Sequence, residues 1–345
     1  MKMKAAVITE YGGIDKVNFA EVDKPKPGVN EVLIQVKSAA LNHLDIWVSK
    51  GRPGAKKNGP HIIGSDASGI VTEVGASVRG MSVGCEVLIN PGLSCGGCEH
   101  CRRGEQSECV LFDIIGLGYQ GAFAEFVVVP AANVFPKPAH LDFNEAAALP
   151  LAYVTAWRML MTRAGLTPGQ TVLIHGIGGG VAIAALQLAK MAGAVVIVTS
   201  SSDDKLKKAR KLGADHIINY KNKDVPAAVR DITVNRGVDI AFDTVGAATM
   251  PINFDVVRRG GEIVICGVTT GPKVELNLQA LYWNQLSILG STMGSDDDFL
   301  KMLLAISAAK LKPVVDSVFP LAEVRDAMTK MESGAQFGKI VLKVE

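Results

Sequence analysis

Short apolar runs of strand length dominate the first 136 residues of the chain. Turn-forming residues, above all Gly, Pro, Asn and Asp, separate the runs, and few stretches show helical periodicity. The runs cover residues 5–8, 31–36, 69–74, 86–89 and 124–129. This pattern predicts a β-rich domain with few helices.

The pattern changes after Asn144. Helical stretches then alternate with short, continuously apolar runs, which are typical of strands that are buried on both faces of a sheet. These runs cover residues 172–175, 194–199, 217–219, 239–242, 262–266 and 286–289. The pattern predicts an α/β domain with a doubly wound parallel sheet.

The end of the chain returns to the first pattern. Residues 337–344 have the pattern of a strand, and we expect the chain to cross back along the helical stretch 296–310 before them. The sequence therefore predicts one domain from residues 1–152 and 293–345 and a second from residues 153–292.

Composition narrows the classes of function. The chain has 345 residues, of which 48% are hydrophobic, and this excludes a small disulfide scaffold and a disordered chain. The net charge of +2 is spread along the sequence, so neither nucleic acid nor an anionic membrane is implied as the main partner. No apolar run resembles a signal peptide core or reaches the roughly 18 residues of a membrane span. We expect a cytoplasmic protein that acts on a small molecule.

A glycine-rich turn follows the strand at residues 172–175. Glycines let a backbone approach a pyrophosphate and point its N–H groups and a helix N-terminus at the charge. The next strand completes a βαβ unit, which favours a dinucleotide site over a merely tight turn. The spacing departs from G-x-G-x-x-G, because Ala182 stands one position late. The cofactor-binding candidates in the turn are Gly176, Gly178, Gly179, Gly180 and Val181.

The tip of the second strand bears on the choice of nicotinamide cofactor, because an acid there binds the ribose 2′-hydroxyl and repels a 2′-phosphate. The tip holds no acid. Ser200 and Ser201 can donate to a phosphate, and Lys205 begins a basic helical stretch. NADPH is therefore favoured. NADH stays open, because two acids follow the tip and the basic stretch can also be a solvated helix face.

Four of the six cysteines fall within 15 residues, a clustering typical of metal binding. Four thiolates in a glycine-containing loop suit a tetrahedral zinc. Such a site has no open position for water or substrate, so the zinc would be structural; an iron–sulfur cluster is the alternative. The candidate ligands are Cys95, Cys98, Cys101 and Cys109.

These features together resemble the medium-chain dehydrogenase/reductase superfamily, which includes zinc alcohol dehydrogenases and quinone oxidoreductases. The superfamily stretch G-H-E-x2-G-x5-G-x2-V appears as Gly64-Ser65-Asp66 with Gly69, Gly75 and Val78, and the cysteine loop, about residues 90–112, resembles its structural zinc lobe. The resemblance implies a GroES-like catalytic domain for residues 1–152 and 293–345 and a Rossmann cofactor domain for residues 153–292.

The catalytic zinc site of the alcohol dehydrogenases is where the resemblance fails. The ligand positions of those enzymes correspond to Asn42, Ser65 and approximately Leu151, none of which is a good zinc ligand. The hydroxyl that relays the alcohol proton corresponds to Leu44. Hydride removal from an alcohol is hard without a Lewis acid.

Zinc-free members of the superfamily use NADPH to reduce a C=C that is conjugated to a carbonyl, in quinones, alkenals, enones or enoyl thioesters. The resemblance implies this activity, closest in character to the quinone oxidoreductase branch, with hydrogen bonds in place of the metal. A zinc-dependent alcohol dehydrogenase and a non-catalytic NADPH-binding protein are the alternatives.

The resemblance also assigns site residues. Asn42, Asp45 and Ser65 are the catalytic candidates, and Asp45 is equally compatible with a turn cap. The proton donor is left open between solvent, Ser65 and Tyr153. A homodimer or homotetramer is expected, with residues 286–289 as a candidate edge strand. The further cofactor-binding candidates are His43, Thr155, Tyr220, Gly267, Val268, Thr269 and Lys339.

Overall fold

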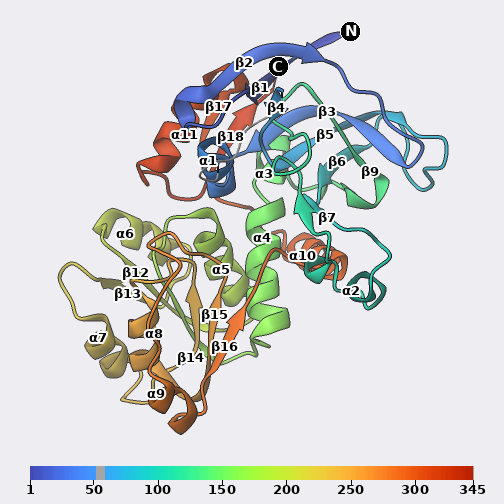
Figure 1. The fold of residues 1–345 in the computed structure, drawn as a ribbon. Coiled ribbons are helices and arrows are strands. Elements are labelled where there is room, and N and C mark those ends of the chain that lie inside the picture. Colours follow the sequence, from blue (N-terminus) through green and yellow to red (C-terminus); the bar gives the residue numbers. More distant parts are fainter. Residues whose placement is uncertain (52–58, 345) are drawn as a thin grey trace. The chain divides into compact units, whose positions relative to one another are not determined.

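The computed structural model describes residues 1–51 and 59–344 of the chain. These residues form two compact units, which we call unit 1 and unit 2. Unit 1 comprises Met1–Ala152 and Ser295–Glu345, and unit 2 comprises Tyr153–Gly294. Each unit has its own sheets and its own hydrophobic core (Figure 1).

Unit 2 is built on a six-stranded parallel sheet with the order β13-β12-β11-β14-β15-β16 (Figure 1). The order runs outward in both directions from the pair β11 and β14, where doubly wound sheets bind their ligands. The predicted α/β fold class is confirmed. The strands are β11 (Thr171–Ile174), β12 (Val195–Ser200), β13 (His216–Asn219), β14 (Val238–Asp243), β15 (Val257–Ile265) and β16 (Ser287–Gly290).

The core of unit 2 contains apolar residues from four adjacent strands, among them Leu173, Ile197, Ala241 and Ile263. Burial on both faces explains why their strands appear in the sequence as continuous apolar runs. The helices of this unit are α4 (Pro150–Trp157), which begins in unit 1, the π-helical turn η4 (Arg158–Arg163), α5 (Gly180–Met191), α6 (Asp203–Lys211), α7 (Val225–Ile232), α8 (Met250–Val256) and α9 (Leu278–Trp283).

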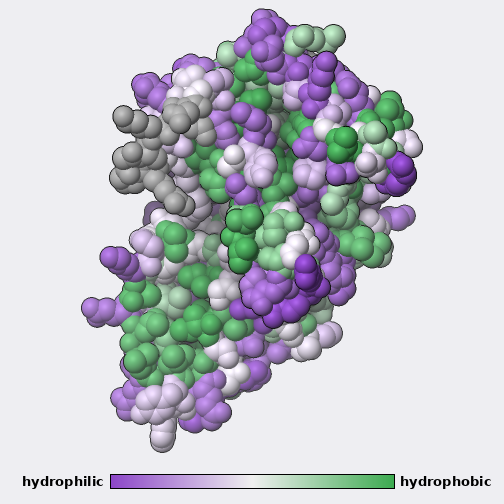
Figure 2. All heavy atoms as spheres, turned by 45° about the vertical axis from the view of Figure 1, so that its right-hand side comes forward, coloured by the Kyte–Doolittle hydropathy of each residue, from purple (hydrophilic) through white to green (hydrophobic). Residues whose placement is uncertain are grey.

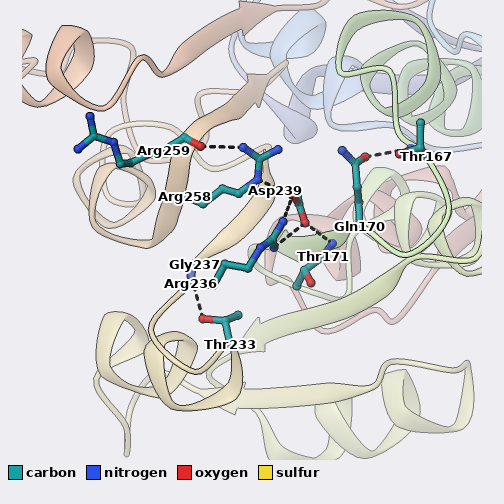
Figure 3. Close-up of polar contacts among 9 residues, drawn as sticks. All are labelled: Thr167, Gln170, Thr171, Thr233, Arg236, Gly237, Asp239, Arg258 and Arg259. Carbon is teal, nitrogen blue, oxygen red and sulfur yellow. Dashed lines mark hydrogen bonds and ion pairs between the residues drawn. The ribbon is translucent and has the colours of Figure 1, made fainter.

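An ion cluster fastens the beginnings of three adjacent strands in unit 2. Asp239 of β14 accepts two hydrogen bonds from Arg236, at 2.7 and 3.0 Å, and one from Arg258 Nε of β15 at 2.5 Å. The backbone N–H of Thr171 in β11 donates to its Oδ2 at 2.8 Å. Figure 3 shows Asp239 between the two guanidinium groups. Burial opposes ionisation, but these hydrogen bonds outweigh it and lower the pKa of Asp239 to about 2.

Unit 1 contains three sheets. The main sheet has the order β10-β6-β5-β3-β18-β17, with β9 also paired to β3, and the smaller sheets are β2-β1-β4 and β7-β8. The strands are β1 (Lys2–Ile8), β2 (Val17–Asp23), β3 (Glu31–Ala40), β4 (His61–Ile62), β5 (Asp66–Val74), β6 (Glu86–Ile89), β7 (Gly92–Leu93), β8 (Asp113–Ile114), β9 (Phe126–Pro130), β10 (Val134–Pro136), β17 (Val315–Pro320) and β18 (Lys339–Lys343).

The last strand of the chain, β18, lies inside the main sheet, between β3 and the edge strand β17. β18 pairs antiparallel with β3 and parallel with β17, and Ile340 and Leu342 join the core of unit 1. The apolar pattern did not predict β2 and β17, because most of their residues are exposed or half-buried and the sequence shows no apolar run there.

Short helices surround these sheets. No described helix is both long enough and apolar enough to cross a membrane. The helices and helical turns of unit 1 are η1 (Ile14–Lys16), α1 (His43–Lys50), α2 (Glu99–Arg102), η2 (Gln106–Glu108), η3 (Ala131–Asn133), α3 (Phe143–Ala147), α10 (Asp296–Ala309), η5 (Leu321–Glu323) and α11 (Val324–Glu332).

Candidate active site

A buried polar cluster in unit 1 brings together the ends of three elements. Asn42 lies between β3 and α1, Asp66 begins β5, and Lys339 begins β18. Lys339 Nζ donates to Asn42 Oδ1 at 2.6 Å and to Asp66 Oδ2 at 2.8 Å. Asn42 Nδ2 donates to Asp66 Oδ2 at 2.9 Å. All three side chains are more than nine-tenths buried.

The direction of these hydrogen bonds follows from the chemistry of the groups. An ammonium only donates and a carboxylate only accepts, so Asn42 must turn its oxygen to Lys339 and its nitrogen to Asp66. The second carboxylate oxygen of Asp66 accepts from the backbone N–H of Leu151 at 2.9 Å. Asp66 was not among the predicted site residues. Its place in the Gly64-Ser65-Asp66 stretch was the signal that could have indicated it.

Asp45 and Ser65 carry buried polar atoms without a hydrogen-bond partner. The backbone N–H of Asn42 donates to Asp45 Oδ2 at 2.7 Å, which is the capping role that the sequence allowed. Asp45 Oδ1 and Ser65 Oγ have no partner among the described residues. Burial raises the pKa of Asp45 to about 7, against the opposing effect of the Asn42 N–H and the Lys339 charge. Unpartnered buried groups of this kind are expected where a ligand or a water binds.

The three candidate positions for a catalytic zinc hold side chains that are poor zinc ligands. The candidate zinc positions 42, 65 and 151 hold an amide, a hydroxyl and an alkyl side chain. Among residues 1–51 and 59–344, the only three or more His, Cys, Asp or Glu side chains whose ligand atoms lie together are the four cysteines. The ammonium of Lys339 already neutralises Asp66.

The four cysteines form a compact sulfur cluster in unit 1. Their four Sγ atoms lie within 4.8 Å of one another. A tetrahedral zinc with bonds of about 2.3 Å needs sulfur atoms about 3.8 Å apart, so a small contraction would complete the site. Backbone N–H groups point at the sulfurs, as from Cys98 to Cys95 Sγ at 3.4 Å, and such bonds lower the pKa of Cys95 and bring that of Cys98 to about 6. The donor set fits a structural zinc.

The glycine-rich turn in unit 2 leaves a helix N-terminus open. Gly179 is the N-cap of the 12-residue helix α5, and no side chain of the described residues caps this end. A Cβ built on Gly179 would meet none of their atoms within 4 Å. Gly176 and Gly178 have φ of +63° and +142°, a region that favours glycine. The residues present fit a pyrophosphate, since the open N–H groups and the helix dipole favour an anion there.

The candidate 2′-phosphate residues gather at the tip of β12. The backbone N–H of Tyr220 donates to the Ser200 carbonyl at 3.1 Å, and a Cβ on Gly178 would lie 3.0 Å from Lys205 Cδ. Lys205 therefore lies against the glycine-rich turn. Asp203, the first acid after the tip, accepts from Asn219 Nδ2 at 2.7 Å. Ser201, beside Ser200, is half-buried.

The remaining candidates are distributed over both units. In unit 2, Gly267, Val268 and Thr269 follow β15, and a Cβ on Gly267 would meet the Thr244 carbonyl oxygen at 2.4 Å. Thr155 is buried in α4 with its hydroxyl 3.8 Å from Met293 Sδ. In unit 1, His43 is the first residue of α1 and its ring lies 6.5 Å from that of Trp47.

Tyr153, the third proposed source of the proton, is fully buried in unit 2. Its hydroxyl donates to the side-chain oxygen of Gln187. The proton of this phenol is therefore engaged with a neighbouring amide, which disfavours Tyr153 as the donor.

Two family models and many known proteins match this chain. A model of the alcohol dehydrogenase GroES-like domain matches residues 28–139, and a model of zinc-binding dehydrogenases matches residues 180–308. An NAD-dependent alcohol dehydrogenase of Sulfolobus acidocaldarius is 33% identical to this chain, over 99% of this chain and 100% of its own length. The chain belongs to the medium-chain dehydrogenase/reductase superfamily. The resemblance predicted from the sequence is confirmed at that level, and the chain is an oxidoreductase of this superfamily.

Two further relatives carry different names. A crystal structure titled NAD-dependent alcohol dehydrogenase superposes with a TM-score of 0.95 at 43% identity and covers 99% of this chain and 100% of its own. A crotonyl-CoA carboxylase/reductase of Cereibacter sphaeroides is 34% identical over 90% of this chain and 79% of its own length. The chain is therefore similar both to proteins named as alcohol dehydrogenases and to one named as a crotonyl-CoA carboxylase/reductase.

Proposed function

We propose that this chain uses NADPH to reduce a C=C conjugated to a carbonyl, in a quinone, an alkenal or enone, or an enoyl thioester, without a catalytic zinc. The observation that carries the proposal is the cluster of Asn42, Asp66 and Lys339. By the resemblance, Asn42 stands at a metal-ligand position of the alcohol dehydrogenases, and here its amide is hydrogen-bonded to the buried ammonium of Lys339 and to Asp66.

The chemistry of a conjugated substrate suits such a cluster. The bound cofactor supplies a hydride to the β-carbon, the C=C electrons move onto the carbonyl oxygen, and the α-carbon of the resulting enolate takes a proton. Fixed hydrogen-bond donors stabilise an enolate oxygen without a metal. One N–H of Asn42 donates to Asp66, and its second N–H is the donor that we assign to the substrate carbonyl.

Asp45 and Ser65 are the side chains that we assign to proton supply. Both have a buried oxygen without a partner among the described residues, and both lie beside the cluster in the sequence. The pKa of Asp45 is raised to about 7 by burial, so the carboxyl can both hold and release a proton near neutral pH.

The preference for NADPH rests on the tip of β12. Ser200, Ser201, Lys205 and Tyr220 offer hydroxyl and ammonium groups to a 2′-phosphate, and Asp203 is engaged with Asn219. His43, Thr155, Lys339 and the segment Gly267–Thr269 remain the candidates for the rest of the cofactor, together with the glycine-rich turn. The crotonyl-CoA carboxylase/reductase among the relatives supports an enoyl thioester as one substrate to test.

A zinc alcohol dehydrogenase is the second candidate function, because several relatives carry that name. Metal content distinguishes the two. Our proposal requires one zinc per chain, at the four cysteines, and an alcohol dehydrogenase requires two. Elemental analysis of the purified protein measures this number.

Turnover provides the functional test. NADPH consumption is followed with quinones, alkenals and enoyl thioesters, and NAD(P)⁺ reduction with primary and secondary alcohols. We expect turnover in the first set. Turnover confined to the alcohols would contradict the proposal, and tight NADPH binding without turnover of any acceptor would indicate a non-catalytic binding protein.

We also propose a homodimer or homotetramer assembled through unit 2. β16 is the edge strand of its sheet, and the neighbouring α9 exposes Leu278, Tyr282 and Trp283, each about two-thirds exposed. Figure 2 shows hydrophobic side chains gathered at the lower left of the face that it draws. Sedimentation of the native protein measures the number of subunits, and a monomer would contradict this assembly.

A further inference from the structure

A buried chain of polar side chains runs beneath the glycine-rich turn of unit 2. It consists of Asp243 at the end of β14, Asn253 in α8, His175 directly after β11, and Thr199 in β12. Each of these residues is at most 2% exposed. None was a predicted site residue, because only the adjacency of three strand ends brings them together.

The series of buried polar side chains starts at Asp243, whose two carboxylate oxygens each accept two hydrogen bonds. Asp243 Oδ1 accepts from the backbone N–H groups of Val245 and Gly246 at 2.7 and 3.0 Å. Asp243 Oδ2 accepts from Thr249 Oγ1 at 2.7 Å and from Asn253 Nδ2 at 2.6 Å. Since the carboxylate only accepts, the nitrogen of the Asn253 amide must face it and the amide oxygen must face the other way.

That orientation fixes the tautomer of His175. Asn253 Oδ1 lies 2.8 Å from His175 Nε2, so Nε2 must carry the proton. Burial lowers the pKa of His175 against the opposing charge of Asp243, which keeps the ring neutral and leaves Nδ1 as an acceptor. Thr199 Oγ1 lies 3.5 Å from Nδ1 and donates to it.

The series of hydrogen bonds ends on the backbone of the glycine-rich turn. With its proton turned to His175, Thr199 Oγ1 accepts the N–H of Gly176 at 3.2 Å, and the Thr199 carbonyl accepts the N–H of Ile177 at 2.8 Å. The Asn253 amide and the His175 ring each have one orientation that satisfies their neighbours, and the Thr199 hydroxyl completes the series. The first glycine of the turn is thereby fixed relative to Asp243, two strands away from β12 in the sheet.

The other end of the chain holds the segment beside Gly267. Val245 and Gly246, which donate to Asp243, lie against residues 267–271: the Thr270 N–H donates to the Val245 carbonyl at 2.9 Å, and a Cβ on Gly246 would lie 3.0 Å from the Val268 Cα. One series of hydrogen bonds and contacts therefore links the turn assigned to the pyrophosphate with the segment that holds the cofactor-binding candidates Gly267, Val268 and Thr269.

We propose that His175 and Thr199 are positioning residues for the dinucleotide, which hold the phosphate turn at the spacing from residues 267–271 that the cofactor requires. This inference rests on the proposed use of a nicotinamide cofactor, and it concerns binding and not the reaction. Neither residue is assigned a contact with the cofactor.

Thr199→Val tests the chain, because it removes the hydroxyl while keeping the branched shape. The Kd of whichever reduced cofactor the wild-type protein binds more tightly, NADPH or NADH, is measured by fluorescence without substrate. We expect Thr199→Val to raise this Kd about tenfold, the equivalent of one hydrogen bond. Thr199→Ser, which keeps the hydroxyl, is expected to stay within about twofold of the wild-type Kd.

Thr233→Val is a matched control within the same unit. The Thr233 hydroxyl likewise accepts a glycine N–H, from Gly237 at 3.0 Å, and donates to a backbone oxygen. It follows α7 and lies at the amino end of β14, whereas Asp243 ends that strand. The control variant should cost stability as Thr199→Val does and leave the Kd unchanged. The matching nucleotide without a pyrophosphate, 2′-AMP or 5′-AMP, should bind equally to all variants.

Two results would overturn the inference: a cofactor Kd in Thr199→Val equal to that in Thr233→Val, or an equal loss of affinity for the nucleotide without a pyrophosphate. His175→Leu supplies an independent measurement, since it should raise the Kd as Thr199→Val does and the double variant should lose nothing further. Because binding is measured without substrate, absence of enone turnover would overturn the proposed function and leave this inference standing.

Discussion

Asn42 is held by two neighbours of opposite charge, since Lys339 donates to its oxygen and Asp66 accepts from its nitrogen. At the scale of single residues, these two hydrogen bonds hold the Asn42 amide in one orientation. An ammonium buried next to a carboxylate is stable only as a pair, because either charge alone would be desolvated without compensation. The pair is therefore open to a direct test.

Lys339→Met removes the cation and leaves Asp66 buried without it. We expect the free energy of unfolding to fall by about 3–5 kcal/mol, the range for breaking a buried ion pair on one side. Urea denaturation at neutral pH measures the change. Lys343→Met, an exposed position at the other end of β18, serves as control and should change it by less than about 0.5 kcal/mol. Equal values for both variants would contradict a buried pair.

Asp45 predicts a pH dependence of stability. Burial raises its pKa to about 7 in the folded chain, against about 3.9 in the unfolded chain. A raised carboxyl pKa contributes stability that is complete below about pH 4 and is lost as the pH rises towards 7. Asp45→Asn does not titrate, so the stability of wild type relative to this variant should fall over that window, by up to about 4 kcal/mol. A difference that is constant from pH 4 to 7 would contradict the assignment.

At the scale of elements, two groups of side chains connect segments that backbone hydrogen bonds alone do not join. The cysteine cluster gathers a loop with little secondary structure, and Asp239 gathers the beginnings of β11, β14 and β15 (Figure 3). The four cysteines are close in sequence, whereas Asp239 joins Thr171 and Arg258, which lie 68 and 19 residues from it along the chain.

Cys98→Ser removes one thiolate from the cluster. We expect the zinc content to fall from one equivalent per chain to near zero, because a structural site needs all four ligands. Limited proteolysis should then cut within residues 90–112. Cys85→Ser, which alters an exposed cysteine outside the cluster, should keep its zinc. Retention of a full equivalent by Cys98→Ser would show that these cysteines do not hold the metal.

Asp239→Asn weakens the ion cluster at the strand beginnings. The folded pKa of about 2 lies below the unfolded value, so the carboxylate contributes stability above about pH 4 that is lost as the pH falls towards 2. We expect a loss of about 2–3 kcal/mol at pH 7 that shrinks in acid. Asp204→Asn, at an exposed ion pair, is the control. A loss that does not depend on pH would argue against an ionised Asp239.

At the scale of the whole molecule, the sequence indicated the sheet of unit 2 well, because strands buried on both faces appear as apolar runs. The apolar pattern did not predict β2 and β17, because most of their side chains are exposed or half-buried. The residues of the cysteine cluster and of the glycine-rich turn are close together in the sequence, so both motifs could be identified from it. Asp66 and Lys339 are 273 residues apart, and their pairing depends on which strands become neighbours. The same holds for the hydrogen bonds that connect Asp243 to Thr199. No local sequence pattern indicates which strands are adjacent.

The chain is an oxidoreductase of this superfamily, and we propose that it reduces a C=C bond and not a C=O bond. An α,β-unsaturated aldehyde offers a C=C and a C=O in one molecule. Reduction with NADPH that carries deuterium at both C4 positions of the nicotinamide, followed by NMR of the product, locates the transferred deuteride. Our account predicts deuterium on the β-carbon of a saturated aldehyde. Deuterium on the carbinol carbon of an unsaturated alcohol would contradict it.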